Sequence, residues 1–275
     1  MYHQFKELAD VDITKEPMEV GPAQHYVMGG VEVDPDTGES IVPGLFAAGE
    51  VSGGMHGSNR LGGNSLSDLL VFGRRAGMGA VEYLNSLGDD RPRASDADLE
   101  AAKAEAVAPL ERSGGENPYT VHSEVQQTMS DLVGIIRKED EIKAALAELE
   151  KLRARAANVS AEGGPAYNPG WHLALDLRNI LLIADCVAEA ALERQESRGG
   201  HTRDDFPGMS PEWRKVNLIA VLDGDHVALK KQPMTPMRSD LLALFDRGEL
   251  AKYYTDAELP PETETAQSSA SEEKS

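Results

Sequence analysis

The chain has 275 residues, of which 40% are hydrophobic and 27% charged, a composition typical of a folded, water-soluble protein. Its formal net charge of -20 at pH 7 argues against binding to nucleic acid or to an anionic membrane surface. The single cysteine, Cys186, excludes an internal disulfide and a cysteine-rich metal or cluster site, and no apolar run approaches the ~20 residues of a membrane span.

The first 22 residues are predicted to form a short amphipathic helix over residues 1–10, followed by a loop or an edge strand. A domain seldom begins with one short helix placed directly before a glycine-rich binding segment, which suggests that related sequence lies upstream. A peripheral helix that caps a sheet is the alternative interpretation.

The stretch His25–Gly79 is dense in glycine and is the most distinctive part of the chain. Residues 25–33 predict a strand interrupted by a close backbone approach at its glycine pair. Residues 45–48 predict a short buried strand, with Glu50 just beyond its end. A helix is predicted over residues 64–87. We expect its packing face to contain Leu66, Leu69, Leu70, Gly73, Gly77 and Ala80.

A boundary rich in proline, serine and charge is predicted at residues 91–98, and a bundle of helices follows it. The helices are expected over residues 98–112, 120–136, 139–157 and from Pro169 onward. Thr120 is a plausible cap for the second of them. On the last helix, Cys186 is interpreted as a small buried residue, because no activating group accompanies it.

The remaining sequence predicts a charged loop, a hairpin and a tail. The loop covers residues 196–207, and the hairpin strands cover residues 215–222 and 226–230 around an Asp-Gly turn. A short helix is expected within residues 241–254. The tail from residue 258 is rich in Glu, Thr and Ser and is predicted to be disordered.

The chemistry of the chain points to the start of the helix at Asn64. Backbone N–H groups at a helix start, together with the helix dipole, attract an anion or an electron-rich carbonyl. Arg60 precedes the glycines there and can grip a carboxylate with two hydrogen bonds, and His25 can donate to the same ligand. Glu50 can accept hydrogen bonds from hydroxyl groups. Each of these residues taken alone also has a purely structural interpretation.

Four motifs resemble the flavoprotein subunit of succinate dehydrogenases and fumarate reductases. They are HYVMGG (25–30), GLFAAGE (44–50), HGSNRLGGNSLSDLLVFGRRAG (56–77) and ESRGGHTRDDFP (196–207). The resemblance covers roughly residues 1–207 and is strongest over residues 24–79. It implies an enzyme that transfers hydride between succinate or fumarate and FAD.

The resemblance also implies roles for individual residues. His25 and Arg60 match the ligands of the substrate carboxylates, and Glu50 matches the glutamate that binds FAD. Ser65 and Leu66 match the pair that faces the flavin ring, and no metal ligand is implied. His56 lies in the same loop, where it either packs the loop or contacts the site. The arginine that transfers the catalytic proton is expected upstream of this chain.

The implied fold class is α+β, with the carboxyl-terminal part of an FAD-binding α/β domain followed by a helical bundle and a small terminal region that contains the hairpin. The expected regions are the end of a capping domain (1–22), the FAD-binding part (23–90), the helical bundle (91–200), the terminal α+β region (201–257) and the disordered tail (258–275). The family's G-x-G-x-x-G loop has no match here. We therefore expect the isolated chain to be inactive.

The implied partners are a dicarboxylate substrate, an iron–sulfur subunit, and the membrane anchor subunits to which that iron–sulfur protein binds. The implied location is the cytoplasm, at the inner face of the cell membrane through those partners. One alternative is an L-aspartate oxidase, which shares the His, Glu and Arg positions but resembles HYxCGG and NRMASNSLLE, where this chain has Met28 and LGGNSLSD. Another alternative is a non-catalytic fragment whose bundle and charged loop dock a partner.

Overall fold

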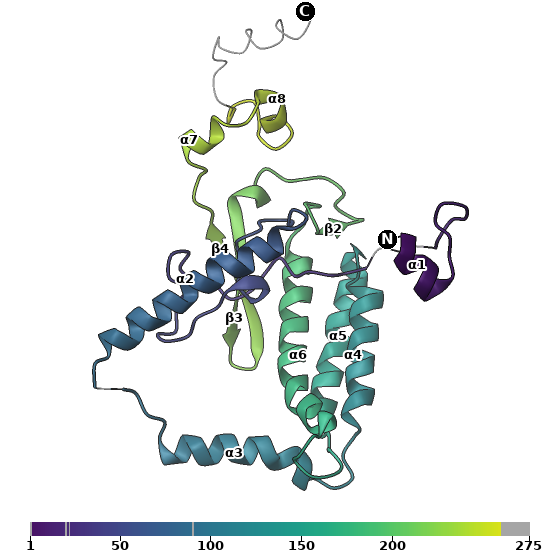
Figure 1. Cartoon of the computed structure of the whole chain (residues 1–275), viewed down its shortest axis with the longest axis vertical. Coiled ribbons are helices and arrows are strands. Elements are labelled where there is room, and N and C mark those ends of the chain that lie inside the picture. Colours follow the sequence, from purple (N-terminus) through teal and green to yellow (C-terminus); the bar gives the residue numbers. More distant parts are fainter. Residues whose placement is uncertain (1, 20, 22, 90, 260–275) are drawn as a thin grey trace, which may run out of the picture.

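The main hydrophobic core lies between α4 (Pro118–Leu132), α5 (Glu139–Ala156) and α6 (Pro169–Glu193), which pack side by side (Figure 1). The computed structural model describes residues 2–19, 21, 23–89 and 91–259. The core side chains recur every three to four residues along each helix, so each helix turns one apolar stripe inward. Those with almost no exposed surface include Val121, Val125, Ile142, Leu149, Leu152, Leu177 and Leu181.

Asparagine and proline set the starts of two bundle helices. The Asn117 side chain accepts the Tyr119 N–H at 2.9 Å, and Asn168 accepts the Trp171 N–H at 3.0 Å. A proline follows each asparagine, at the helix position where a missing N–H costs nothing. The prediction that Thr120 caps α4 is therefore wrong, because the cap lies three residues earlier.

The predicted helix before the bundle is confirmed as α3 (Asp96–Glu111), which lies across one end of the bundle (Figure 1). Ser95 caps it by accepting the Asp98 N–H at 3.1 Å. The indole of Trp171 in α6 donates to the Ala106 carbonyl at 2.7 Å. This half-buried bond joins α3 to the bundle.

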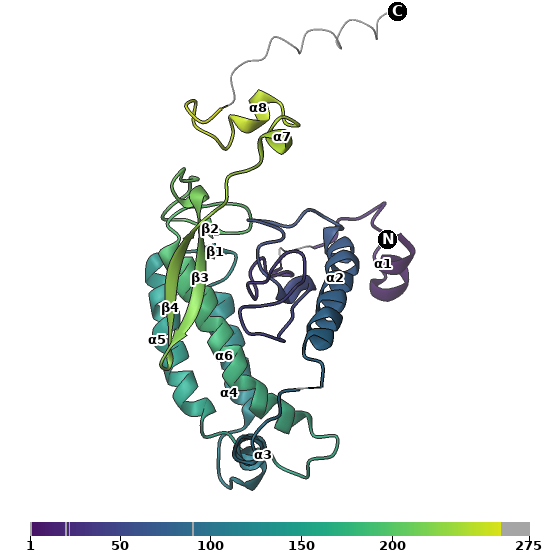
Figure 2. The same ribbon diagram turned by 90° about the vertical axis from the view of Figure 1, so that its left-hand side faces the viewer.

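A second layer is formed by α2 (Asn64–Ser86) and the loops of residues 27–54, which lie between α2 and α6 (Figure 2). The buried residues of α2 are Asp68, Ala76 and Gly79. A Cβ at Gly79 would collide with the Thr37 carbonyl, so only glycine lets the helix lie this close to the loop. The helix itself ends within one residue of its predicted end.

The predicted packing face of α2 is wrong. Leu66 is 67% exposed and Leu70 is 77% exposed, and Val81 and Leu84 farther along the helix are also exposed. These leucines, Gly73 and Gly77 lie on one stripe by their spacing of three and four residues. The stripe is apolar, as the sequence indicates, but α2 packs on its loops through the opposite face.

The two strands predicted within residues 25–48 are also wrong. Only single bridges occur there, among them Val31 with Ser52 and Glu39 with Phe46, and Leu45 is 51% exposed. The close backbone approach is confirmed, because a Cβ at Gly30 would collide with the Val51 carbonyl. Gly53 occupies the other side of the same approach, so the chain crosses itself here backbone to backbone.

The predicted hairpin is confirmed as β3 (Val216–Asp223) and β4 (His226–Pro233), with Gly224 at φ +61° in the turn. It lies along α6 (Figure 2), where Lys231 pairs with Glu193 at 2.8 Å. Another sheet pairs β1 (Ile136–Arg137) in parallel with β2 (Thr202–Arg203). It links the start of α5 to the loop after α6.

Short helices complete the described chain: α1 (Tyr2–Ala9), the 3-10 turns η1 (Gly49–Val51) and η2 (Trp213–Lys215), α7 (Ser239–Leu242) and α8 (Arg247–Leu250). The single helix expected within residues 241–254 is thus replaced by two short ones.

The predicted disordered tail begins at Glu258, whose carboxylate pairs with Arg214 at 2.7 Å. Residues 260–275 lie outside the described residues. Within the described ranges, no helix combines the length and the apolar character needed to cross a bilayer. The α+β fold class is confirmed, and the individual domain boundaries remain predictions.

Candidate functional site

The start of α2 is open. Its N-cap, Gly63, has φ +84° and contributes no capping side chain, and a Cβ at Gly62 or Gly63 would meet no atom within 4 Å. Ser65 is half-buried and Leu66 is exposed just beyond. A planar, electron-rich group can therefore approach the positive end of the helix dipole, although the Asn64 and Leu66 N–H groups donate to the Leu61 and Gly63 carbonyls at 3.1 and 3.3 Å. This geometry fits the flavin that the sequence implies.

Arg60 lies in the loop directly before this helix start. Its guanidinium carbon sits 4.7 Å from the centroid of the Tyr26 ring, and its Nη1 donates to the Leu61 carbonyl at 3.3 Å. Within the described chain, Arg60 forms no ion pair with a carboxylate. Its Nε is buried, so the donors that it can offer to an external carboxylate are on its two Nη atoms.

His25 and Glu50 border the same loop. His25 is exposed and directly precedes Tyr26, the ring on which Arg60 rests. Glu50 is exposed within η1, and its Oε1 accepts the Val27 N–H at 3.1 Å. One carboxylate oxygen therefore ties η1 to the HYVMGG segment. The exposed carboxylate can still accept a hydrogen bond from a ligand hydroxyl.

A buried cluster beneath the loop is not predicted by the sequence. His56 Nε2 lies 3.4 Å from Asp68 Oδ2, with side chains 10% and 2% exposed respectively. The His56 ring meets the Tyr26 ring edge-on at 5.4 Å between centroids. Burial, together with the charges of Asp68 and Glu50, raises the pKa of the Tyr26 phenol. Tyr26 therefore stays protonated beside Arg60.

Polar atoms in this cluster lack hydrogen-bond partners among the described residues. They are both carboxylate oxygens of Asp68, Nε2 of His56 and Nε of Arg60. Asp68 was missed because the apolar stripe dominates the pattern of α2, whereas this single carboxylate lies on the face that packs. Its only sequence signal is an acidic residue in the second turn of an otherwise apolar segment.

The structure thus brings Tyr26, Glu50, His56, Arg60 and Asp68 together around one loop. Ser65 and Leu66 lie at the helix start that this loop leads into, and His25 lies at its exposed border. The surroundings of His56 support the interpretation that its side chain packs the loop. The roles of His25, Glu50, Arg60, Ser65 and Leu66 remain predictions.

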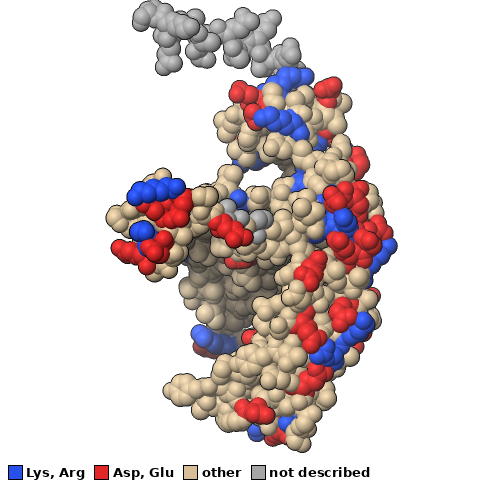
Figure 3. All heavy atoms as spheres, turned by 90° about the vertical axis from the view of Figure 1, so that its right-hand side faces the viewer, with Lys and Arg blue, Asp and Glu red and all other residues tan. Residues whose placement is uncertain are grey.

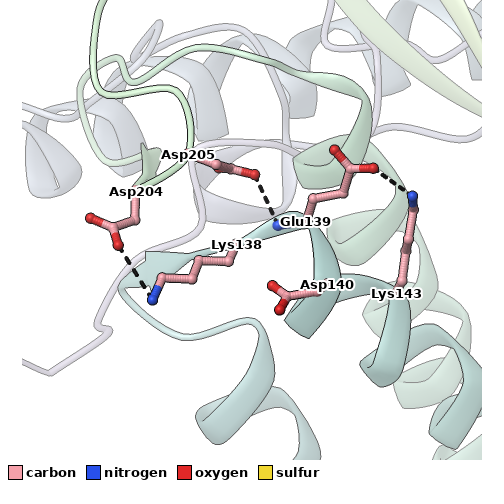
Figure 4. Close-up of a pocket in the computed structure, with 6 residues that line it drawn as sticks. All are labelled: Lys138, Glu139, Asp140, Lys143, Asp204 and Asp205. Atoms are coloured by element: carbon pink, nitrogen blue, oxygen red, sulfur yellow. Dashed lines mark hydrogen bonds and ion pairs between the residues drawn. The ribbon is translucent and has the colours of Figure 1, made fainter.

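A shallow pocket lies elsewhere, at the start of α5 (Figure 4). Two of its acidic side chains are held by neighbouring groups: Lys138 pairs with Asp204 at 3.4 Å, and the Glu139 N–H donates to Asp205 at 3.0 Å. Lys143 pairs with Glu139 across the first turn of the helix. No group of three or more metal-ligating side chains was found in the described ranges.

The face viewed in Figure 3 carries acidic and basic side chains interspersed, with no continuous basic patch. Nucleic acid requires such a patch to neutralise its phosphates. This face therefore agrees with the acidic composition of the chain.

Two family models match the chain. Residues 1–66 match the FAD binding domain, and residues 122–245 match the fumarate reductase flavoprotein carboxyl-terminal region. The first match covers most of the loops around Glu50, Arg60 and the start of α2. The second covers α4 through the hairpin.

Curated relatives match over most of the chain. A fumarate reductase (CoM/CoB) subunit of Methanothermobacter marburgensis is 38% identical over 80% of this chain and 39% of its own length. The succinate dehydrogenase flavoprotein subunit of Coxiella burnetii is 35% identical over 86% of this chain and 42% of its own. The chain therefore spans about two fifths of the length of these relatives.

Solved structures agree with the curated relatives. A chain of the Mycobacterium smegmatis Sdh1 complex superposes with a TM-score of 0.85 at 60% identity, over 93% of this chain and 44% of that one. A chain of the Escherichia coli quinol fumarate reductase superposes with a TM-score of 0.78 at 32% identity, over 86% and 42% respectively.

Proposed function

Since this chain belongs to the succinate dehydrogenase and fumarate reductase flavoprotein family, we propose that it forms one wall of the active site of an FAD-dependent enzyme that interconverts succinate and fumarate. The observation that carries the proposal is the placement of Arg60. It has no carboxylate partner within the described chain, and it stands on the loop that leads into the open start of α2.

On the substrate side, Arg60 and His25 hold the two carboxylates of the dicarboxylate. Tyr26 supports the guanidinium of Arg60, whose carbon lies 4.7 Å from the centroid of the ring. A bidentate guanidinium–carboxylate contact fixes both distance and orientation, and it orders the substrate before any bond changes. His25, exposed at the rim, donates to the second carboxylate.

On the cofactor side, Ser65 and Leu66 face the flavin ring and Glu50 accepts a hydrogen bond from an FAD hydroxyl. The match to the FAD binding domain identifies the cofactor. When bound, FAD supplies the hydride acceptor or donor. The start of α2 contributes a fixed positive potential, which favours electron density on the adjacent ring.

We further propose that an iron–sulfur subunit takes the electrons and that membrane anchor subunits hold the assembly at the inner face of the cell membrane. The support is the origin of the two structural matches, one from an Sdh1 complex and one from a quinol fumarate reductase. Reconstitution with an iron–sulfur subunit, followed by co-purification, tests this part of the proposal.

The test of the substrate site is Arg60→Ala in the assembled flavoprotein. Loss of the guanidinium fork should lower succinate turnover by about 10²–10³-fold, because one charged donor that orients and polarises the substrate is removed. Flavin content should stay unchanged and binding of malonate, a non-reacting dicarboxylate, should weaken. Arg74→Ala, an exposed arginine farther along α2, is the matched control. Unchanged succinate kinetics in Arg60→Ala would contradict the proposal.

A further inference from the structure

The turn Arg198–His201, from the loop that follows the helical bundle, touches the loop that carries Arg60. The Gly200 N–H donates to the Ser58 carbonyl at 2.9 Å. A Cβ added to Gly199 would collide with that same carbonyl oxygen. Gly199 also has φ +58°, a conformation that favours glycine. Both views show this loop beside the segment that enters α2 (Figures 1 and 2).

The contact lies at a point where the Arg60 loop has little backbone support of its own. Between Gly54 and Leu61, the other backbone hydrogen bonds in the described structure are Gly57 N–H to Gly54 at 3.4 Å and Asn64 N–H to Leu61 at 3.1 Å. Neither restrains the chain between Ser58 and Arg60. The bond from Gly200 is therefore the backbone restraint nearest to Arg60 on its amino-terminal side.

The turn itself is held by a buried carboxylate. Glu196 has no exposed surface and accepts hydrogen bonds from Arg194 at 2.7 Å, from Arg198 at 2.9 Å and from the Ser210 N–H at 2.8 Å. Burial opposes ionisation of Glu196, but these donors outweigh it and lower its pKa. With hydrogen bonds from Arg194, Arg198 and the Ser210 N–H, the Glu196 carboxylate fixes the direction in which Arg198 leaves the loop.

His201 closes the other end of the turn. Its Nδ1 lies 3.0 Å from Arg137 Nη1 and its Nε2 lies 3.0 Å from the Arg194 carbonyl. A guanidinium only donates, so Nδ1 accepts and Nε2 carries the proton. The Arg198 N–H also donates to the His201 carbonyl at 2.8 Å. Both ends of the turn are thus anchored to the loop after α6 and to β1.

We propose that the turn Arg198–His201 is a brace that sets the position of the Ser58–Arg60 segment, and that Gly199 is a positioning residue for substrate binding. Because Gly199 has no side chain, the rigid turn can approach the Ser58 carbonyl closely enough for Gly200 to bond it. The brace transmits the position of the helical bundle to the guanidinium of Arg60. This inference rests on the proposed role of Arg60.

The test is Gly199→Ala in the assembled flavoprotein, with two matched controls. The added methyl pushes the Ser58 carbonyl away, so Arg60 shifts relative to the start of α2. Gly200→Ala adds a methyl in the same turn, where its contact to the Ser58 carbonyl would be an ordinary 3.8 Å. Gly224→Ala imposes a similar backbone strain, at φ +61°, in open space.

For Gly199→Ala we expect the KM for succinate and the Kd for malonate to rise on the order of 10-fold or more, because small misplacements of binding groups are costly. Flavin content should be unchanged, and the thermal midpoint should fall no further than in Gly224→Ala. Both controls should keep the original KM and Kd. Values for Gly199→Ala equal to those of the controls would overturn the proposal.

A second variant tests the brace in case the Gly199→Ala protein does not fold. Arg198→Lys keeps the charge but cannot grip Glu196 with two nitrogens, so it loosens the turn without adding atoms. It should also raise KM and the malonate Kd, and unchanged values would overturn the brace. Arg60→Ala separates the two proposals. If Arg60→Ala abolishes malonate binding while Gly199→Ala and Arg198→Lys leave malonate binding unchanged, only the proposed brace is contradicted. If Arg60→Ala has no effect on malonate binding, the proposed function is contradicted.

Discussion

Arg60 is supported by an aromatic ring and a neighbouring carbonyl, and its charge is not neutralised by the described part of the chain. Arg203, by contrast, has a carboxylate partner: it has no exposed surface and pairs with Asp205 at 2.7 Å. Arg203 lowers the pKa of Asp205 to about 2, so this pair stays ionised and structural. The two arginines show how surroundings separate an arginine without a carboxylate partner in the described chain from one that is held in a buried ion pair.

His201 makes a residue-scale prediction about pH. Burial, followed by the charges of Arg137, Arg203 and Arg194, lowers the pKa of its imidazole, although its bond to the Arg194 carbonyl opposes this. In the unfolded chain the imidazole titrates near its ordinary value of about 6.5. Below that pH the unfolded state binds the proton more readily, so the contribution of His201 to stability is complete above about pH 6.5 and declines as the pH falls.

We therefore expect the free energy of unfolding to fall as the pH is lowered below about 6.5, with a smaller slope in His201→Asn. Urea denaturation across this range measures it. His226→Asn, in the exposed end of the hairpin, is the control and should leave the slope unchanged. An equal slope in His201→Asn and the original protein would contradict the burial argument.

Among the elements, α6 has the clearest division between buried and exposed faces. Leu177 is fully buried against α4 and α5, whereas Leu182 on the same helix is 37% exposed. Leu177→Ala should lower the free energy of unfolding by about 2–5 kcal/mol, because it leaves a cavity in a close-packed core. Leu182→Ala should cost only about 0.5–1 kcal/mol. Chemical denaturation of both variants tests this, and similar losses would contradict the assigned core.

The helix α2 divides its faces differently. Its loop-facing side depends on small residues, with Ala76 against Gly38 and Gly79 against Thr37, so the loops lie close to the helix backbone. Its leucine stripe lies on the opposite face and is exposed. An apolar face of this length is unusual on a protein surface. It indicates that α2 is suited to packing contacts on both of its faces.

For the whole molecule, this stripe predicts self-association of the isolated 275-residue chain. Exposed apolar side chains gain free energy when they pack against one another, and a second copy presents the same stripe. Leu70→Glu combined with Val81→Glu should shift the chain toward monomer at unchanged thermal stability. Leu99→Glu, at an exposed leucine of α3, is the control. Sedimentation velocity measures the outcome, and association that persists in the double variant would contradict the prediction.

The sequence alone determined the long helices, the hairpin and the flavoprotein motifs. These features are local: apolar spacing, a proline at a helix start and an Asp-Gly turn act within a few residues. His25, Glu50, Arg60, Ser65 and Leu66 were found through motifs, and they lie on neighbouring segments in the structure.

Only the tertiary structure decided which face of α2 packs, that residues 25–48 form loops instead of strands, and that Asp68 and His56 lie buried beneath Arg60. The backbone contacts of Gly199 and Gly200 with Ser58 were likewise decided by the tertiary structure alone. Hydrophobic spacing predicts that a face is buried but not what covers it, and it carries no signal for backbone contacts between glycines far apart in the chain. Those contacts depend on how the bundle and the α2 layer are placed together.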